Sequence, residues 1–309
     1  MSKIEKDFFY KNVFSKKNNY FYKKIEDMKF NILALSLIML TSFGSCSGTK
    51  ERKDADEEGK NPKTLVLYYS QTGTTRAVAE ELRKELGVDI DSIVAVEPYG
   101  VDYDATIERW KKEKEDSVKV AIKPLNVNVN DYDTIFLGYP IWGGTFASPV
   151  ATFLADNSLE GKTVVTFATF GSGGLESSTK DVAAAQPGAN VLEGYGVRAA
   201  RIEKAPLEIN RFLIENGYKK GTVEPLPPFG ESKALSEGDK AIFQEACGNY
   251  KFPLGTPVAV AMREYDGIKE YRFDVESQSP DGNKGKSTIY VVQSSEPGST
   301  PEFTRVIRN

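Results

Sequence analysis

The chain has 309 residues, of which 40% are hydrophobic and 27% charged, with a formal net charge of −4. This composition is typical of a soluble globular protein with room for two domains, and it offers no broad basic surface, so we expect no nucleic-acid partner. The absence of histidine excludes Ser-His-Asp and Cys-His catalysis and histidine-based metal sites. Two cysteines, Cys46 and Cys247, are too few for a zinc cluster or a disulfide framework, so no metal site is predicted.

The first 62 residues have the layout of an export signal followed by a tether. Lys29 precedes an apolar run over 30–40, which is too short for an ordinary membrane span and fits a signal peptide over 28–45. Gly44-Ser45-Cys46 resembles a bacterial lipobox, with Cys46 as the lipidated mature N-terminus. A plain signal peptide or an N-terminal anchor is the alternative. The polar, charged stretch over 46–62 indicates a flexible tether, about 20–25 Å long as a coil.

An N-terminal extension over 1–27, rich in Lys, Phe and Tyr, precedes this signal and suggests that Met28 is the true initiator. The signal has no twin arginine, which favours export in the unfolded state. We therefore expect an exported protein that is lipid-anchored to the cell envelope, at the outer membrane or the cell surface.

From residue 63, apolar strands alternate with amphipathic helices. This alternation predicts an α/β fold in which a parallel sheet is covered on both faces, and right-handed crossovers make the sheet doubly wound. Ligands of such sheets bind at the carboxyl ends of the strands. The expected strands are 64–70, 90–96, 133–139, 163–169 and 190–197, and the expected helices are 74–86, 103–115, 147–157, 176–185 and 206–216.

The turn between the first strand and the first helix, Ser70-Gln71-Thr72-Gly73-Thr74-Thr75, predicts a phosphate-binding loop. A helix start offers unpaired N–H groups and the positive end of a dipole, and four hydroxyls add further donors. Gly73 lets the backbone curl around an anion. The loop has no lysine, so it differs from the G-x-x-x-x-G-K-[ST] nucleotide loop. The alternative is an ordinary capped turn, because Ser and Thr are favoured helix caps.

Two further segments follow strands: Gly138-Tyr-Pro-Ile-Trp-Gly-Gly-Thr145 and Thr169-Phe-Gly-Ser-Gly-Gly174. Together with the S-x-T-G-x-T loop they resemble, in order and spacing, the flavodoxins, which hold FMN; the resemblance runs over about 63–218. It implies a flavodoxin-like domain over 63–222 with a five-stranded parallel sheet in the order 2-1-3-4-5, and FMN as the cofactor. The cofactor-binding residues that it implies are Ser70, Gln71, Thr72, Gly73, Thr74, Thr75, Pro140, Ile141, Trp142, Gly143, Gly144, Phe170, Gly171, Ser172 and Gly173.

The resemblance also assigns roles around the flavin ring. Trp142 is expected at a loop tip, stacked on one face of the isoalloxazine, with Phe170 supporting the other side; the alternative is that Trp142 is a core aromatic. Gly143 and Gly144 would allow the backbone to reorient near the flavin N5, and N–H groups of 171–174 would approach the polar edge of the ring. Related proteins often carry a second tryptophan where this chain has Gly143.

A Pro-rich stretch over 225–228 marks a boundary, and 223–309 predicts a small α+β domain. A helix is expected over 237–250. Period-two alternation over 271–276, the Asp266-Gly267 hairpin signal and runs over 288–292 and 303–307 then predict about four antiparallel strands, an arrangement that resembles the cystatin-like one. We find no catalytic motif in this domain, and a structural or docking role is the default.

The sequence thus predicts an FMN-binding redox protein tethered to a membrane by an N-terminal lipid. Electron carrier and flavin-dependent oxidoreductase remain open, and the partner is either a redox protein or a small reductant. The alternative is a flavin-free surface lipoprotein that uses the flavodoxin-like fold as a binding module.

Overall fold

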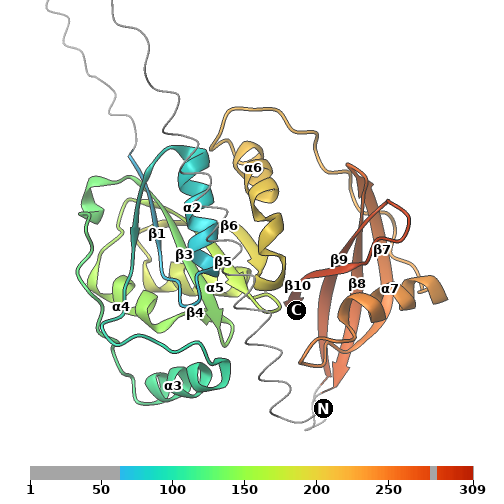
Figure 1. Cartoon of the computed structure of the whole chain (residues 1–309), viewed down its shortest axis with the longest axis horizontal. Coiled ribbons are helices and arrows are strands. Elements are labelled where there is room, and N and C mark those ends of the chain that lie inside the picture. The colour runs from blue at the N-terminus through green and yellow to red at the C-terminus, as the bar shows by residue number, and fades with distance from the viewer. Residues whose placement is uncertain (1–62, 279–283, 309) are drawn as a thin grey trace, which may run out of the picture. The chain divides into compact units, whose positions relative to one another are not determined.

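The computed structural model describes residues 63–278 and 284–308 (Figure 1). The predicted extension, signal peptide, lipidation site Cys46 and tether lie outside the described residues. Within these two ranges, no helix combines the length and the apolarity that crossing a membrane requires.

The N-terminal part of the described chain is built on a parallel sheet. The strand order is β2-β1-β3-β5-β6, and each neighbouring pair along this path is parallel. A short antiparallel strand, β4, pairs only with the end of β3. The predicted doubly wound sheet in the order 2-1-3-4-5 is therefore confirmed. The strands are β1 (Thr64–Tyr68), β2 (Asp89–Ser92), β3 (Thr134–Trp142), β4 (Thr145–Phe146), β5 (Thr163–Phe170) and β6 (Asn190–Arg198).

Helices cover both faces of this sheet (Figure 1). Val78 of α2 and Ile209 of α6 share one apolar core with Val66 of β1, whereas Phe153 of α4 and Val182 of α5 share the other with the opposite face. Because the central strands are buried on both sides, they read as continuous apolar runs. The helices are α2 (Thr74–Leu86), α3 (Tyr103–Glu115), α4 (Ser148–Asp156), α5 (Leu175–Ala185) and α6 (Ala205–Glu215).

The second strand is shorter than the sequence pattern suggests. It was expected over 90–96, but β2 ends at Ser92, which is the partner of Tyr68 at the end of β1. The phosphate loop begins just after Tyr68, so β2 has no neighbour to pair with beyond that point. The chain instead pairs with a later segment, where the N–H of Val96 donates to the carbonyl of Ala121.

The C-terminal part, here called the C-terminal module, consists of one helix and an antiparallel sheet in the order β10-β9-β8-β7. The α+β prediction is confirmed. Asp266 and Gly267 have φ of 48° and 69°, the left-handed conformation that a two-residue hairpin turn requires. The elements are α7 (Glu237–Cys247), β7 (Thr256–Tyr265), β8 (Ile268–Gln278), β9 (Lys284–Ser294) and β10 (Glu302–Arg308).

Helix α7 packs its apolar side on the sheet. Phe243 lies edge-on to Phe273, with ring centroids 5.1 Å apart. Cys247 is buried in the same core, and burial raises its pKa to about 12, so the thiol stays protonated. This cysteine therefore behaves as a small hydrophobic residue.

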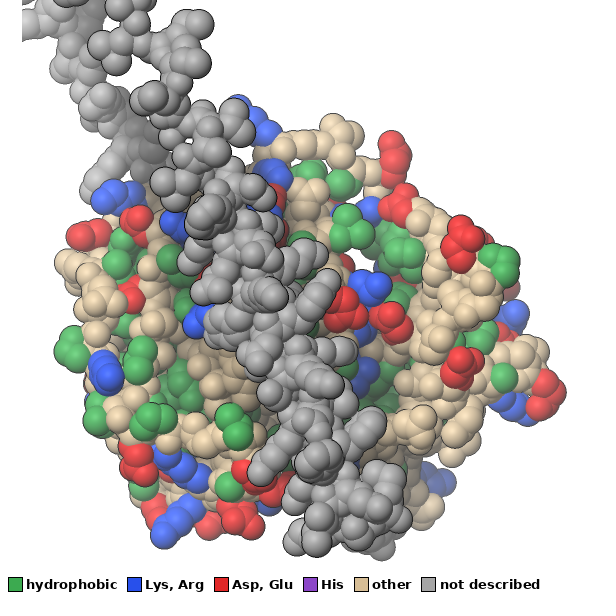
Figure 2. Space-filling view, in the orientation of Figure 1, with side chains coloured by type: hydrophobic (Ala, Val, Ile, Leu, Met, Phe, Trp, Pro, Cys, Tyr) green, Lys and Arg blue, Asp and Glu red, His purple; other side chains and the backbone are tan. Residues whose placement is uncertain are grey.

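Charged side chains of both signs are interspersed on the visible face of the described residues (Figure 2). Among the described residues, ion pairs one helical turn apart include Arg76–Glu80, Lys180–Glu176 and Arg211–Glu215. This face therefore carries no extended field of a single sign.

Candidate functional site

The three predicted loops emerge at one edge of the parallel sheet. They follow β1, β3 and β5, which are adjacent in the strand order. The segments also touch: the Thr75 hydroxyl lies 2.8 Å from that of Thr169, and Ser177 Oγ, in the first turn of α5, donates to the carbonyl of Gly144 at 2.9 Å. The structure therefore brings the predicted segments together at the carboxyl ends of neighbouring strands, where ligands of such sheets bind.

The phosphate loop leads into a helix, α2, whose N-terminus has no side-chain cap. Gly73 is the N-cap of α2 with φ 91°, and no side chain makes a capping hydrogen bond there. The first turn also has no acidic residue. Ser70 Oγ accepts the Gly73 N–H at 3.1 Å and so closes the loop. The positive end of the α2 dipole thus lacks the negatively polarised group that most helices place beside it.

The threonine hydroxyls of the loop differ in exposure: those of Thr72 and Thr74 lie at the surface, and that of Thr75 lies in the interior. Thr72 Oγ1 and Thr74 Oγ1 lie 3.2 Å apart at the exposed rim. Thr75 is buried, and its hydroxyl is already hydrogen-bonded to Thr169. Thr72 and Thr74 are consequently placed to donate to a bound anion, whereas Thr75 holds the loop to β5.

Gln71 ties the loop to another element. Its Nε2 donates to Thr106 Oγ1 at 2.7 Å and also to the carbonyl of Gly100. Thr106 lies in the first turn of α3, and its hydroxyl donates to the carbonyl of Asp102. The loop is therefore anchored on one side by β5 and on the other by α3.

The loop after β3 is a tight hairpin to β4. Trp142 pairs with Thr145, which leaves Gly143 and Gly144 as a two-residue turn with φ of 55° and 89°. Positive φ at both positions strongly favours glycine. Gly143 has a second constraint, because a Cβ at this position would overlap the indole ring of Trp110 from α3. A tryptophan therefore does lie at this turn, although it comes from a different part of the chain.

The prediction that Trp142 lies at a loop tip is wrong. Trp142 is the last residue of β3 and only 5% exposed, and the tip is formed by the two glycines after it. Its ring lies edge-on to Tyr69 at 5.8 Å and tilted against Tyr99 at 4.8 Å. Pairing with β4 keeps the tryptophan in the strand and turns its side chain into this cluster. Its stacking on a flavin ring stays a prediction.

A buried carboxylate, that of Glu113, supports the aromatic cluster. The only local signal for it is the i,i+4 spacing of Arg109 and Glu113. Glu113 accepts hydrogen bonds from Tyr99 OH at 2.6 Å, Ser148 Oγ at 2.7 Å and Arg109 Nε at 2.7 Å. The Arg109 guanidinium also lies 3.9 Å from the centre of the Tyr99 ring. Burial and the hydrogen bond to Glu113 raise the pKa of Tyr99, so the phenol remains neutral.

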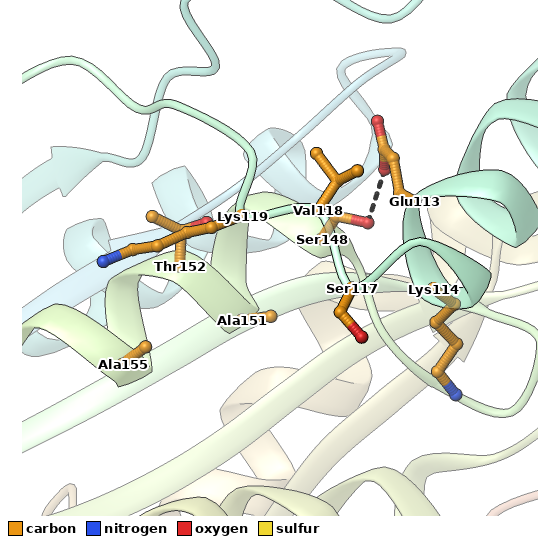
Figure 3. Close-up of a pocket in the computed structure, with 9 residues that line it drawn as sticks. All are labelled: Glu113, Lys114, Ser117, Val118, Lys119, Ser148, Ala151, Thr152 and Ala155. Atoms are coloured by element: carbon orange, nitrogen blue, oxygen red, sulfur yellow. Dashed lines mark hydrogen bonds between the residues drawn. The ribbon is translucent and has the colours of Figure 1, made fainter.

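A pocket lies on the other side of Glu113, between the end of α3 and α4 (Figure 3). The figure shows Ser148 hydrogen-bonded to Glu113 there, with Ala151 and Ala155 on the adjacent face of α4. None of the predicted cofactor-binding residues lines this pocket. It is therefore separate from the edge where the three loops meet.

The loop after β5 joins Phe170 to α5. Phe170 is the last residue of β5 and is buried. The carbonyl of Gly171 accepts from Arg198 Nε at 2.6 Å, and that of Ser172 accepts the N–H of Val306 at 2.7 Å. Both donors come from distant parts of the chain, and sequence reasoning missed them because no local pattern marks such contacts.

Comparison with known protein families identifies the family of this chain. A flavodoxin family model matches residues 63–232, more than half of the 309 residues. A search of curated proteins returned no match.

Three solved structures are similar to part of the chain. A candidate flavoprotein from Bacteroides eggerthii DSM 20697 is 33% identical over 49% of this chain and 98% of its own, with a TM-score of 0.42. One from Bacteroides uniformis ATCC 8492 is 30% identical over 48% and 99%, with a TM-score of 0.43. A flavoprotein of Lactobacillus acidophilus NCFM, solved in complex with FMN, is 24% identical over 49% and 99%, with a TM-score of 0.40. From the extent of the family match, the chain belongs to the flavodoxin family.

Proposed function

We propose that this protein binds FMN and acts in electron transfer or flavin-dependent reduction while held to the cell envelope by a lipid on Cys46. The observation that carries the proposal is the start of α2, where a helix without a cap meets two outward-facing hydroxyls. Membership of the flavodoxin family supports the choice of FMN over other phosphorylated ligands.

The donors of the loop fit a phosphate monoester. Backbone N–H groups in the first turn of α2, together with Thr72 and Thr74, supply hydrogen bonds, and the helix dipole favours negative charge. Hydrogen bonds to a charged acceptor are stronger than neutral ones. The absence of an acidic side chain from the first turn leaves nothing there to repel a dianion.

The chain also offers a neutral aromatic wall for a flavin ring. Tyr69, Tyr99 and Trp142 form one buried cluster beside the turn at Gly143 and Gly144. Burial raises the pKa of both tyrosines, so neither phenol adds a negative charge near the ring. The carboxylate of Glu113 behind the cluster is paired with Arg109. The protein thus supplies binding, orientation and exclusion of water, whereas FMN when bound supplies reversible electron transfer.

The first experiment asks whether the protein retains a flavin. The chain from residue 46, with Cys46→Ser to keep it free of lipid, is incubated with FMN and desalted. We expect a yellow protein with flavin absorbance in a one-to-one ratio, which is bleached by a chemical reductant and recovers in air. A colourless protein after desalting would favour the flavin-free binding module instead.

The second experiment asks whether a lipid anchors the protein. Expressed in full in a bacterium with lipoprotein processing, the chain should fractionate with membranes, and the variant Cys46→Ala should move to the soluble fraction. Stable anchoring needs more than one acyl chain, which lipoprotein modification provides. Unchanged membrane association of Cys46→Ala would contradict the anchor and leave the flavin proposal intact.

A further inference from the structure

The C-terminal module contacts the loop after β5 through backbone groups. Both lie within one compact unit of the chain. The N–H of Val306 in β10 donates to the carbonyl of Ser172 at 2.7 Å, and Val306 forms a parallel bridge with Gly173. A Cβ at Gly173 would overlap the carbonyl oxygen of Val306, so glycine is what allows this close approach. In effect, β10 adds one strand pairing to the predicted flavin loop.

Arg198 makes a second link between the same two segments. From the end of β6 its Nε donates to the carbonyl of Gly171, and its Nη1 donates to the carbonyl of Phe303 at 2.8 Å. The guanidinium also lies over the rings of Phe303 and Tyr250, at 4.2 and 5.4 Å from their centres. Because the side chain is mostly buried, burial lowers the pKa of Arg198, yet its charge is matched by two carbonyls and two aromatic faces.

The module also reaches the helix that anchors the phosphate loop. Lys251 Nζ lies 3.3 Å from Asp104 Oδ1 and 5.0 Å from the centre of the Tyr103 ring, both in the first turn of α3. Gln71 of the phosphate loop is bonded to Thr106 in the next part of the same turn. The C-terminal module therefore touches elements on both sides of the site.

The hydrogen bonds to the carbonyls of Gly171 and Ser172 also fix the direction of the N–H groups in the same peptides. A trans peptide is planar, so the N–H of each residue points away from the carbonyl that precedes it. Holding the carbonyl of Gly171 on Arg198 and that of Ser172 on Val306 therefore aims the N–H groups of Ser172 and Gly173 to the opposite sides of their peptides. A loop that is rich in glycine would otherwise sample many conformations and lose more entropy when it is ordered.

We propose that the C-terminal module is a positioning element for FMN: β10 and Arg198 hold the loop Gly171–Gly174 in the conformation that receives the flavin ring, and so slow the release of the flavin. The inference rests on the proposed FMN binding and gives the C-terminal module a role. Ordering the loop in advance removes part of the cost of binding. For an exported protein, slow release has a clear use, because a lost flavin would have to be replaced outside the cytoplasm.

The test uses Val306→Pro in the mature chain. Proline removes the N–H that reaches Ser172, and since this N–H points away from β9, the hydrogen-bond ladder of the module's own sheet is kept. Arg308→Pro is the control for a proline ring in β10, because it places the same ring two residues further along the strand, at an exposed position. Val306→Ala is the control for loss of the buried valine side chain, because it keeps the N–H, and it should release FMN at the parent's rate. Dissociation is followed by the recovery of flavin fluorescence after dilution to a protein concentration at which the released flavin does not rebind.

We expect Val306→Pro to release FMN about three- to tenfold faster than the parent, the range for loss of one hydrogen bond, and Arg308→Pro to match the parent. Riboflavin should show the same fold-change, because the loop acts on the ring and not on the phosphate. The flavin absorbance bands should also shift in Val306→Pro, since the ring loses fixed neighbours. Arg198→Gln provides a second variant that breaks the link without a proline and should act in the same direction.

Folding of each variant is checked by its melting temperature without flavin. Folded variants that release both flavins at the parent's rate would overturn the positioning role while leaving FMN binding intact. A faster release of FMN but not of riboflavin would also overturn it, because the effect would then lie at the phosphate. If neither variant folds, hydrogen exchange on the flavin-free parent tests the contact instead. The Val306 amide should be protected from exchange by its hydrogen bond to Ser172, and rapid exchange would contradict that hydrogen bond. A parent that binds no flavin would instead contradict the proposed function.

Discussion

The starts of α2 and α7 solve the same physical problem in opposite ways. Both helices leave N–H groups in their first turn that need acceptors. In α7 the chain supplies them: Ser236 Oγ accepts the Asp239 N–H at 3.2 Å, and the Asp239 carboxylate accepts the Ser236 N–H at 2.9 Å. This is a complete capping box, with Glu237 adding a further negative charge. In α2 the N-cap is Gly73, with no capping side chain and no acid.

The two helices therefore differ in where their first N–H groups find acceptors. At the start of α7, side chains of the helix itself accept hydrogen bonds from its first N–H groups. This stabilises the helix and leaves those N–H groups unavailable to a ligand. The start of α2 lacks that stabilisation, which leaves its N–H groups and its positive dipole end available to an anion, as the proposed FMN binding requires. If this interpretation is correct, changes that make α2 resemble α7 should stabilise the free protein and abolish binding of the phosphate.

The largest expected effect comes from giving α2 an acid of its own. Thr74→Asp places a carboxylate at the first position of the helix, where it should stabilise the flavin-free protein by about 0.3–1 kcal/mol. The same charge repels a phosphate dianion at close range, so the affinity for FMN should fall at least about 100-fold. Melting of the free protein and a fluorescence titration with FMN measure the two effects.

The matched control is Thr74→Asn, which has nearly the shape of Asp without its charge. It should retain most of the FMN affinity that Thr74→Asp loses. An unchanged FMN affinity in Thr74→Asp would mean that the phosphate lies elsewhere.

Removing the cap of α7 should have the complementary result. Ser236→Ala leaves the Asp239 N–H without its side-chain acceptor, so the free energy of unfolding should fall by about 0.5–2 kcal/mol. The affinity for FMN should not change, because the start of α7 is not part of the proposed FMN site. A chemical denaturation series with and without FMN separates these quantities, and a large loss of FMN affinity would show that the two helix ends are not independent.

A smaller effect should follow from loosening the anchor of the phosphate loop. Gln71→Leu removes the hydrogen bonds to Thr106 and Gly100, so the loop must be ordered by the ligand, and FMN affinity should fall about two- to tenfold. Thr106→Val should have a similar effect, and the double variant should lose little more than either single one. Additive losses would indicate that the two residues act separately.

The smallest effect concerns acid pH at α7. Burial alone would raise the pKa of Asp239, but hydrogen bonds from the hydroxyl and N–H of Ser236 bring it below its ordinary value of 3.8. A lowered folded pKa means that the ionised carboxylate contributes stability above the unfolded value and loses it as the pH falls through the folded one. Asp239→Asn should therefore be less stable than the parent near neutral pH, with the gap closing below about pH 4. A gap that is independent of pH would exclude this contribution.

Local features of the fold and site could be predicted from the sequence. The central strands β1, β3 and β5 read as apolar runs because both of their faces are buried, and α2 and α3 begin and end where their periodicity predicted. The predicted phosphate loop stands out in the sequence because its side-chain donors lie within six consecutive residues, and its binding of a phosphate stays a prediction.

Features that depend on distant partners could not be predicted. The end of β2 is set by where β1 stops, and the burial of Trp142 depends on β4, Tyr69 and Tyr99. The link from Val306 to Ser172 joins segments in different parts of the chain. No spacing rule within either segment points to the other, so only the folded structure shows this contact.

Phosphate binding at the start of α2 is tested by comparing the affinities of the protein for FMN and for riboflavin, which differs from FMN only in lacking the phosphate. If the start of α2 holds that phosphate, FMN should bind at least about 100-fold more tightly, because two or more charge-assisted hydrogen bonds are involved. The preference should shrink markedly in the double variant Thr72→Val/Thr74→Val, while riboflavin affinity stays the same. Equal affinities of the parent protein for the two flavins would contradict the account.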